Sequence, residues 1–141
     1  MKEFWSWLQV GFAALGGFTS WFFGHNDGLL TALVVFVIAD YVSGVLRAIV
    51  EQKVSSSIGS RGISKKVVIF ILVGIAHMVD VEVLGAGDVI RNTVIFFYLS
   101  NEGISMLENA IRLGLPVPEK LRNILLQLRD KSEEKTENGN K

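Results

Sequence analysis

The N-terminal part of this chain carries a long apolar stretch that restricts the folds open to it. Phe4–Phe23 contains 20 residues, and none of them is charged. At about 1.5 Å per residue, a helix of this length crosses a hydrocarbon core of roughly 30 Å. Trp5, Trp7 and Trp21 lie near its two ends, where aromatic residues favour the membrane interface. Bulky residues follow in place of a small-residue cleavage site, so we expect an uncleaved membrane helix and not a signal peptide.

Three further apolar segments follow the first one. The second, Leu29–Ile49, is uncharged until Asp40. The third is shorter, because its apolar run ends at Val79 and both Asp80 and Glu82 have to lie at the membrane interface. The fourth runs up to a pair of prolines, which stop a helix. We therefore predict four transmembrane helices at residues 4–23, 29–49, 67–84 and 90–113, joined by turns at 24–28 and 85–88 and by a polar loop at 50–66.

The chain beyond the fourth apolar segment is mostly polar. Apolar residues spaced i, i+3, i+4 and i+7 predict a short amphipathic helix over 117–131, lying on the membrane surface or on a partner. Residues 132–141 lack apolar side chains, and we expect them to be disordered. The predicted fold is an all-α integral membrane protein with a transmembrane domain at 1–116. The apolar stripe consists of Leu121, Ile124, Leu125 and Leu128.

Basic residues predict how this protein is oriented. Cytoplasmic segments of membrane proteins are enriched in Lys and Arg. The segments that follow the second and fourth predicted spans are basic, whereas the two intervening turns contribute only Arg91. This alternation predicts a multi-pass membrane protein with both termini in the cytoplasm. The cytoplasmic basic residues are Lys53, Arg61, Lys65, Lys66, Arg112, Lys120, Arg122, Arg129 and Lys131.

Composition and motifs argue against an enzyme. The formal net charge is zero, which gives no indication of a nucleic-acid partner, and the chain has no cysteine. Its two histidines are far apart, and no metalloprotease, hydrolase or phosphate-binding motif occurs. Residues 85–88 match the GxGD string of intramembrane aspartyl proteases, but those enzymes need two aspartates that meet inside the membrane. Asp88 is expected in an outer turn and Asp40 near mid-bilayer. We expect no catalytic residues, no metal and no cofactor.

Polar side chains inside the predicted spans are the strongest functional signal. A charged residue at the centre of a membrane helix costs ~3 kcal/mol, whereas each large apolar residue returns only ~0.5 kcal/mol. Glu102 therefore offsets most of the gain of the fourth span, which must face protein or water. Counted depth places Asp40, His77 and Glu102 near one level, and Arg47 near Glu108. The pairing or pore candidates are Asp40, Arg47, His77, Asn101, Glu102, Glu108, Asn109 and Arg112, with Arg61, Lys65 and Lys66 in the basic loop.

Two pairings are open for Glu108. One is an ion pair with Arg47 across two helices, and the other is a local pair with Arg112 at i, i+4. A shared polar face on the fourth span contains Asn101, Ser105, Glu108 and Arg112, opposite Phe97, Ile104, Leu107 and Ile111.

Three segments resemble one family. The toxin-secretion/phage-lysis holins of Gram-positive bacteria and their phages are similar to this chain from about Leu29 to Asp130. The resemblance rests on DYVSGVLRA at Asp40–Ala48, SSSIGSRGISKK at Ser55–Lys66 and NTVIFFYLSNEGISMLENAIRLGLPVPEKL at Asn92–Leu121.

The resemblance implies a non-enzymatic protein that accumulates in the host cytoplasmic membrane and homo-oligomerises into lesions. Through such lesions an endolysin or a secreted toxin leaves the cell, and an antiholin is a further implied partner. An antiholin made from an internal start is not expected, because the next methionine after Met1 is Met78. The alternatives are a small four-helix proton-coupled transporter using Asp40 and Glu102, and a membrane anchor for an enzyme docked on the C-terminal helix.

Overall fold

The computed structural model describes residues 1–85 and 87–138, with side chains described for all of these except 128, 129 and 132–138. Every regular element in this part of the chain is helical, which confirms the all-helical fold class. The elements are α1 (Lys2–Phe23), α2 (Gly28–Val50), α3 (Ser56–Met78), a π-helical turn η1 (Val79–Val83), α4 (Val89–Arg112) and α5 (Glu119–Asn138).

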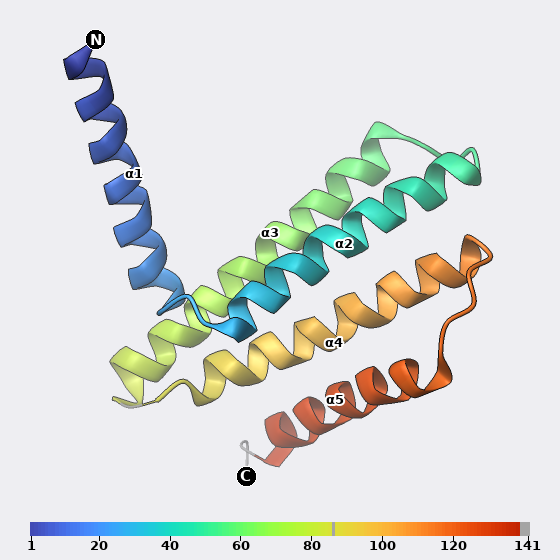
Figure 1. Ribbon diagram of the computed structural model, residues 1–141. Coiled ribbons are helices and arrows are strands. Elements are labelled where there is room, and N and C mark those ends of the chain that lie inside the picture. Colours follow the sequence, from blue (N-terminus) through green and yellow to red (C-terminus); the bar gives the residue numbers. More distant parts are fainter. Residues whose placement is uncertain (86, 139–141) are drawn as a thin grey trace.

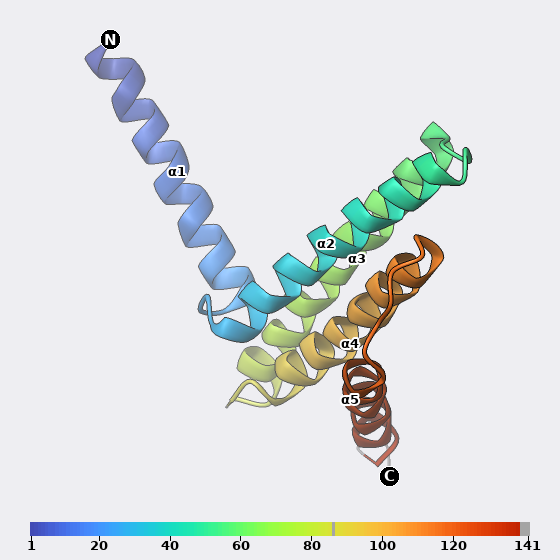
Figure 2. The same ribbon diagram turned by 45° about the vertical axis from the view of Figure 1, so that its right-hand side comes forward.

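Helices α2, α3 and α4 pack together along their lengths, and α1 extends away from them (Figures 1 and 2). The apolar core of this bundle consists of Leu33, Val37, Ile69, Val73 and Ile95, contributed by all three helices. In α1, all of whose residues are described, none is buried. The bundle is therefore the body of the fold, and α1 is attached to it at one end.

The end of α1 packs on α3 through aromatic rings. A Cβ added to Gly74 would lie 2.0 Å from Phe22, so the ring of Phe22 occupies the space that the glycine leaves open. Phe23 packs edge-on against Phe70 with ring centroids 6.3 Å apart. Gly24 then adopts a φ of 77°, which ends the helix in the predicted turn.

The prediction of a polar loop over residues 50–66 is wrong for its second half, because α3 begins at Ser56. Ser55 caps the helix, and its hydroxyl accepts a hydrogen bond from the Ile58 amide at 3.3 Å. The glycines that resembled a turn, Gly59 and Gly62, instead face Tyr41: a Cβ on Gly62 would lie 3.5 Å from that ring. Small residues in a helix allow α2 to approach closely here.

The third predicted span continues α3 into the π-helical turn, where Asp80 lies inside the protein. Its side chain is fully buried and accepts hydrogen bonds from the amides of Ile90 and Arg91 at 3.0 and 2.8 Å. These amides belong to the first turn of α4, where backbone N–H groups lack helical partners and favour an anion. Glu82 is exposed as expected.

Helix α4 ends at Arg112, before the prolines that were expected to stop it. Gly114 adopts a φ of 85°, and its amide bonds to Ile111 O at 2.9 Å while Leu115 N bonds to Ala110 O at 3.0 Å. This is a Schellman motif, which satisfies the last carbonyls of α4. The connection through the prolines then leads back into α5.

Helix α5 is longer than the amphipathic helix predicted for 117–131, and it lies beside α4 (Figures 1 and 2). Leu125 from the predicted stripe is buried, and its methyl groups would lie about 3 Å from a Cβ on Gly103 of α4. The helix continues to Asn138, so the expected disorder of 132–141 does not hold for residues 132–138. Leu128 of the stripe and residues 139–141 lie outside the described side chains or residues.

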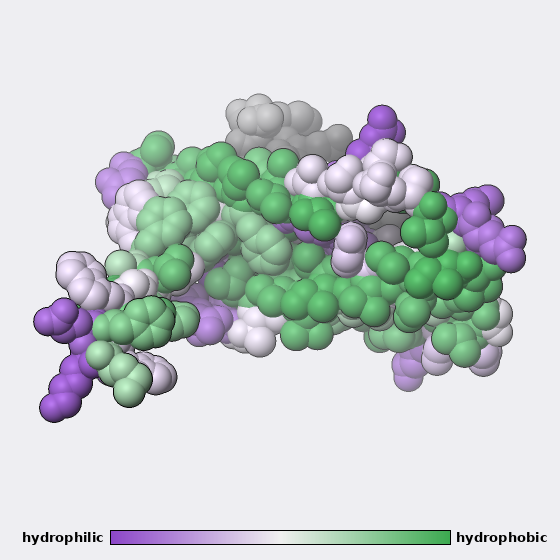
Figure 3. Space-filling model, turned by 90° about the horizontal axis from the view of Figure 1, so that it is seen from above, coloured by the Kyte–Doolittle hydropathy of each residue, from purple (hydrophilic) through white to green (hydrophobic). Residues whose placement is uncertain are grey.

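The surface is more apolar than is usual in a soluble protein, and ionisable groups are buried beside the apolar core. Large apolar side chains are exposed along α1, α2 and α3, whereas Asp40, Asp80, Arg91, Glu102 and Asn109 are buried. Figure 3 shows one face dominated by hydrophobic residues. Extensive exposed apolar surface around buried ionisable groups is typical of contact with lipid or with other protein.

Within the described residues, only α2 is long and apolar enough to cross a membrane by length and composition. The three basic residues in the first turns of α3 and the polar residues of α4 interrupt the apolar character of those helices. The four predicted crossings are therefore not confirmed, and all of them remain a prediction.

Candidate functional site: a polar network inside the helical bundle

Lys66 connects three helices through two carboxylates. Its ammonium group on α3 forms ion pairs with Asp40 of α2 and with Glu102 of α4. All three side chains are at least four-fifths buried, with exposed fractions of 17%, 10% and 9%. A buried charge is stable only when it is paired and hydrogen-bonded, so this contact explains how the marginal fourth span accommodates Glu102.

Asn109 extends this network toward the C-terminal end of α4. Its side-chain amide donates to Asp40 Oδ1 at 3.2 Å and to Ser43 Oγ at 3.0 Å. Asp40 therefore receives one donor from α3 and another from α4, which fixes its carboxylate between the two helices. The arrangement satisfies the Asp40 carboxylate with donors from two helices and sets the register of α2 against α4.

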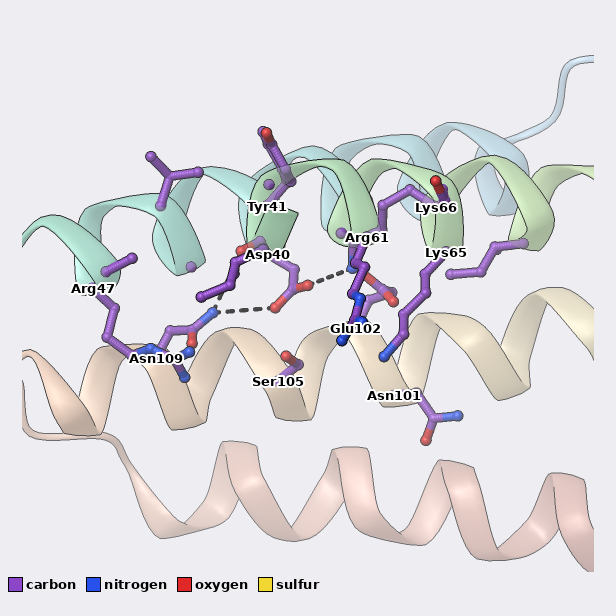
Figure 4. Close-up of a pocket in the computed structure, with 18 of the residues that line it drawn as sticks. Asp40, Tyr41, Arg47, Arg61, Lys65, Lys66, Asn101, Glu102, Ser105 and Asn109 are labelled. Carbon is purple, nitrogen blue, oxygen red and sulfur yellow. Dashed lines mark hydrogen bonds and ion pairs between the residues drawn. The ribbon is translucent and has the colours of Figure 1, made fainter. Parts of the chain in front are cut away.

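A cavity of about 1170 Å³ opens beside this network, between α2, α3 and α4. Figure 4 shows Asp40 and Glu102 on one side, with Arg61 and Lys65 extending from α3 toward α4. Arg47 also lines the cavity, and its Nε is buried without a hydrogen-bond partner among the described residues. The predicted polar residues Asn101 and Ser105 line the same space.

A second polar cluster lies at the opposite end of the bundle, around Arg91. This guanidinium is fully buried, and it donates to the Phe23 carbonyl at 2.6 Å and the His25 carbonyl at 3.2 Å. It also pairs with Asp27, with Nη1 2.8 Å from Oδ2. The hydrogen bond from Arg91 is the main cause that lowers the pKa of Asp27 from its ordinary value. Arg91 thus fastens the α1–α2 turn to the start of α4.

His77 belongs to this second cluster and not to the level of Asp40 and Glu102 that depth counting predicted. Its Nδ1 lies 3.6 Å from Asp88, which also lies 3.8 Å from His25. A Cβ on Gly24 would approach His77 to 2.9 Å, so the glycine is required for this packing. Asp88 and Asp40 therefore belong to separate clusters, which agrees with the dismissal of a protease dyad.

Glu108 is not brought into contact with Arg47. Glu108 is exposed on α4, and no ion pair joins it to Arg47 or to Arg112 in the part of the chain that the structure describes. Arg112 instead lies 3.8 Å from Glu51 at the end of α2. The cross-helix pair expected from counted depth is therefore absent from this structure.

Sequence reasoning missed the roles of Lys66, Asp80 and Arg91. Lys66 was assigned to the basic loop because the turn-like glycines before it hid the start of α3. Asp80 lies at the end of an apolar run, which predicts a position at the membrane interface but does not indicate its hydrogen bonds with the amides of α4. Arg91 is the one basic residue of its segment, and its partner Asp27 is 64 residues away in the sequence, so no local pattern indicates the pair.

Comparison with known proteins decides the family. The sequence profile of the bacteriophage holin family matches residues 17–130, from the end of α1 into α5. This chain belongs to the bacteriophage holin family. The match contains both polar clusters and the whole α2–α4 bundle, and it agrees with the resemblance found in the three sequence segments.

Several curated relatives match most of the chain. An uncharacterized protein of Listeria innocua is 44% identical over 134 residues, which are 95% of each chain. An uncharacterized 14.9 kDa protein of the nagH 3' region of Clostridium perfringens is 38% identical over 131 residues, covering 93% of this chain and 99% of the relative. An uncharacterized protein of Bacillus subtilis is 30% identical over 112 residues, 79% of each chain. No solved structure gives a significant match.

Proposed function

We propose that this protein acts as a holin in the strict sense: it accumulates in the bacterial cytoplasmic membrane and oligomerises into lesions that release an endolysin or a toxin. The family match over residues 17–130 carries the proposal. The exposed apolar surface and the buried ion network support it, because apolar side chains can contact lipid while the paired charges are kept away from it.

We further propose four crossings with both termini in the cytoplasm. The contact between Arg112 and Glu51 brings the basic α2–α3 connection and the end of α4 to the same end of the bundle. The Arg91–Asp27 pair brings the α1–α2 turn and the start of α4 together at the opposite end. Two groups of connections, one basic and one with few cations, favour the positive-inside arrangement. The side chains of Asn26 and Ser57 are exposed in these two groups and allow a direct test.

The topology test uses single cysteines, since the chain has none of its own. Before lesions form, Asn26→Cys should react with a membrane-impermeant thiol reagent added outside intact cells, and Ser57→Cys should react only after the membrane is opened. Labelling of Ser57→Cys from outside would show that the orientation is wrong.

The lysis test uses expression in bacteria with and without a co-expressed endolysin. Induction should collapse the membrane potential abruptly, and the culture should then clear only when the endolysin is present. Sustained growth and an intact potential, with the protein inserted at high level, would contradict the proposal.

The transporter alternative is less well supported. A proton-coupled carrier needs carboxylates that bind and release a cation during turnover, whereas Lys66 already pairs with both Asp40 and Glu102. A carrier would also leave a co-expressed endolysin inside the cell, so the same lysis test separates the two functions. The membrane-anchor alternative predicts no loss of membrane potential.

A further inference from the structure

The cavity between α2, α3 and α4 has an excess of positive charge. Four cationic side chains and two carboxylates line it, which leaves a difference of two positive charges. The excess lies at the end of the bundle that carries the α2–α3 connection. The six charged residues are Asp40, Arg47, Arg61, Lys65, Lys66 and Glu102.

The two carboxylates exceed the charge of Lys66 by one, so they offset at most one of the three remaining cations. Both Asp40 and Glu102 bind Lys66, and Asp40 also accepts a hydrogen bond from Asn109. Arg47, Arg61 and Lys65 have no ion pair among the residues that the structure describes. Three cations therefore face a cavity whose acidic groups are already occupied.

Arg47 supplies an independent sign of a missing acceptor. Its Nε is buried and makes no hydrogen bond within the described part of the chain. Buried donors are nearly always satisfied, because leaving one without a partner costs most of its hydration energy. Guanidinium groups bind phosphate oxygens particularly well, through parallel N–H groups. An anionic oxygen in the cavity would satisfy this donor.

The walls of the cavity suit an amphiphile better than a free ion. Val45, Ile58 and Val68 line it and are 36%, 58% and 49% exposed. The cavity is thus continuous with apolar surface that a lipid chain would contact. The first turn of α3, from Ser55 to Gly59, adds the positive end of a helix to the same wall.

We propose that this cavity binds the phosphate headgroup of an anionic phospholipid from the cytoplasmic leaflet. Arg47, Arg61 and Lys65 hold the phosphate oxygens, and the acyl chains lie along the exposed valines. Basic pockets between membrane helices on the cytoplasmic side are suited to such lipids. The assignment of the leaflet rests on the orientation given under the proposed function.

The test measures lipid retention by the purified full-length protein. Protein is incorporated into nanodiscs that contain phosphatidylglycerol and phosphatidylcholine, released into detergent, and examined by native mass spectrometry for bound lipid. The pocket variant is Arg61→Gln with Lys65→Gln. The matched control is Lys120→Gln with Arg122→Gln, which removes the same charge from exposed residues of α5 outside the cavity.

The wild-type protein and the α5 control should retain phosphatidylglycerol in preference to phosphatidylcholine. The pocket variant should lose about 25-fold in affinity, since each basic side chain near an anionic lipid surface contributes roughly a fivefold factor. The charge-preserving variant Arg61→Lys with Lys65→Arg should keep most of the binding. An unchanged circular dichroism spectrum verifies that each variant is folded.

Three results would overturn the proposal: equal retention of both lipids, unchanged retention in the pocket variant, or equal loss in the α5 control. Displacement of the lipid by inorganic phosphate would assign the site to the free ion and would also overturn it. The readout uses purified protein and does not depend on lysis, so failure here is distinguishable from failure of the holin function.

Discussion

Arg91 at the start of α4 binds Asp27 in the α1–α2 turn through both terminal nitrogens, with Nη1 2.8 Å from Oδ2 and Nη2 3.4 Å from Oδ1. The same guanidinium holds two backbone carbonyls of that turn, and its own amide is held by Asp80. The connection between α1 and α2, the end of α3 and the start of α4 are therefore joined at one fully buried residue.

Replacing Arg91 should destabilise the fold strongly. Arg91→Ala removes a buried cation, leaves two carbonyls without their donor and leaves Asp27 without its ion-pair partner, which should cost about 3–5 kcal/mol. Unfolding in mixed detergent micelles, followed by circular dichroism, measures the loss. Arg112→Ala is the control, because Arg112 is exposed and its contact with Glu51 is 3.8 Å long, so it should cost about 1 kcal/mol or less. Equal losses in the two variants would show that the Arg91 cluster is not a structural centre.

Acidification should weaken the same cluster through Asp27. The pKa of Asp27 is lowered in the folded protein by its hydrogen bond from Arg91, relative to an ordinary value of 3.8. A lowered folded pKa means that the stabilising contribution is complete above the ordinary value and is lost as the pH falls toward the lowered pKa. Unfolding measured from neutral pH to below pH 3.8 should therefore show a smaller decline for Asp27→Asn than for wild type. Parallel curves would exclude this contribution.

Removing Lys66 should be far more damaging than removing the adjacent Lys65. Lys66→Leu leaves the carboxylates of Asp40 and Glu102 buried without a cation, which should cost about 3–5 kcal/mol and reduce accumulation in the membrane. Lys65→Leu should accumulate normally, because Lys65 is exposed. Quantitative immunoblots of membrane fractions measure both.

The reduced accumulation of Lys66→Leu should arise from the lost charge and not from the changed shape of the side chain. A triple variant with Lys66→Leu, Asp40→Asn and Glu102→Gln removes all three charges together and should recover much of the accumulation, since neutral groups cost less to bury. If the triple variant accumulates no better than Lys66→Leu alone, the ion network is not the reason for the defect.

Gly74 should be essential for the attachment of α1. Gly74→Ala places a methyl group 2.0 Å from Phe22, which must move and thereby loosen α1 from α3. Limited proteolysis in detergent should then cut the turn after α1 faster than in wild type. Gly17→Ala is the matched control in α1 itself, where a Cβ meets nothing within 4 Å, and it should leave the cleavage rate unchanged. The contact between Phe22 and Gly74 would be refuted by equal cleavage in both variants.

The sequence predicted the helices better than the contacts between them. Apolar runs and turn residues placed α1, α2 and α4 within one or two residues of their observed bounds. The start of α3 was misplaced because Gly59 and Gly62 are typical of turns in isolation, and only their packing on Tyr41 explains them as helical residues. Local pattern determines where a chain is apolar, but a glycine's role depends on its neighbour in space.

The sequence predicted which residues belong to the polar site, but not which of them contact each other. Burial of Asp40 and Glu102 followed from their position in apolar helices, but the cation between them lies on a third helix. Counting residues along a helix gives depth only, and it therefore paired Arg47 with Glu108, which faces outward. Rotation of each helix about its axis is set by tertiary packing, which a single sequence does not record.

The attachment of α1 at one end makes this helix a rigid arm with a pivot at residues 24–27. Its 22 residues form an arm of about 33 Å at about 1.5 Å per residue. A rotation of about 10° at this end would therefore displace Met1 by about 6 Å and would shift the contacts of Phe22 and Phe23 with α3. Atomic shifts of a few tenths of an ångström around Arg91 are thus converted into movements as large as a lipid chain is wide at the far end of the arm.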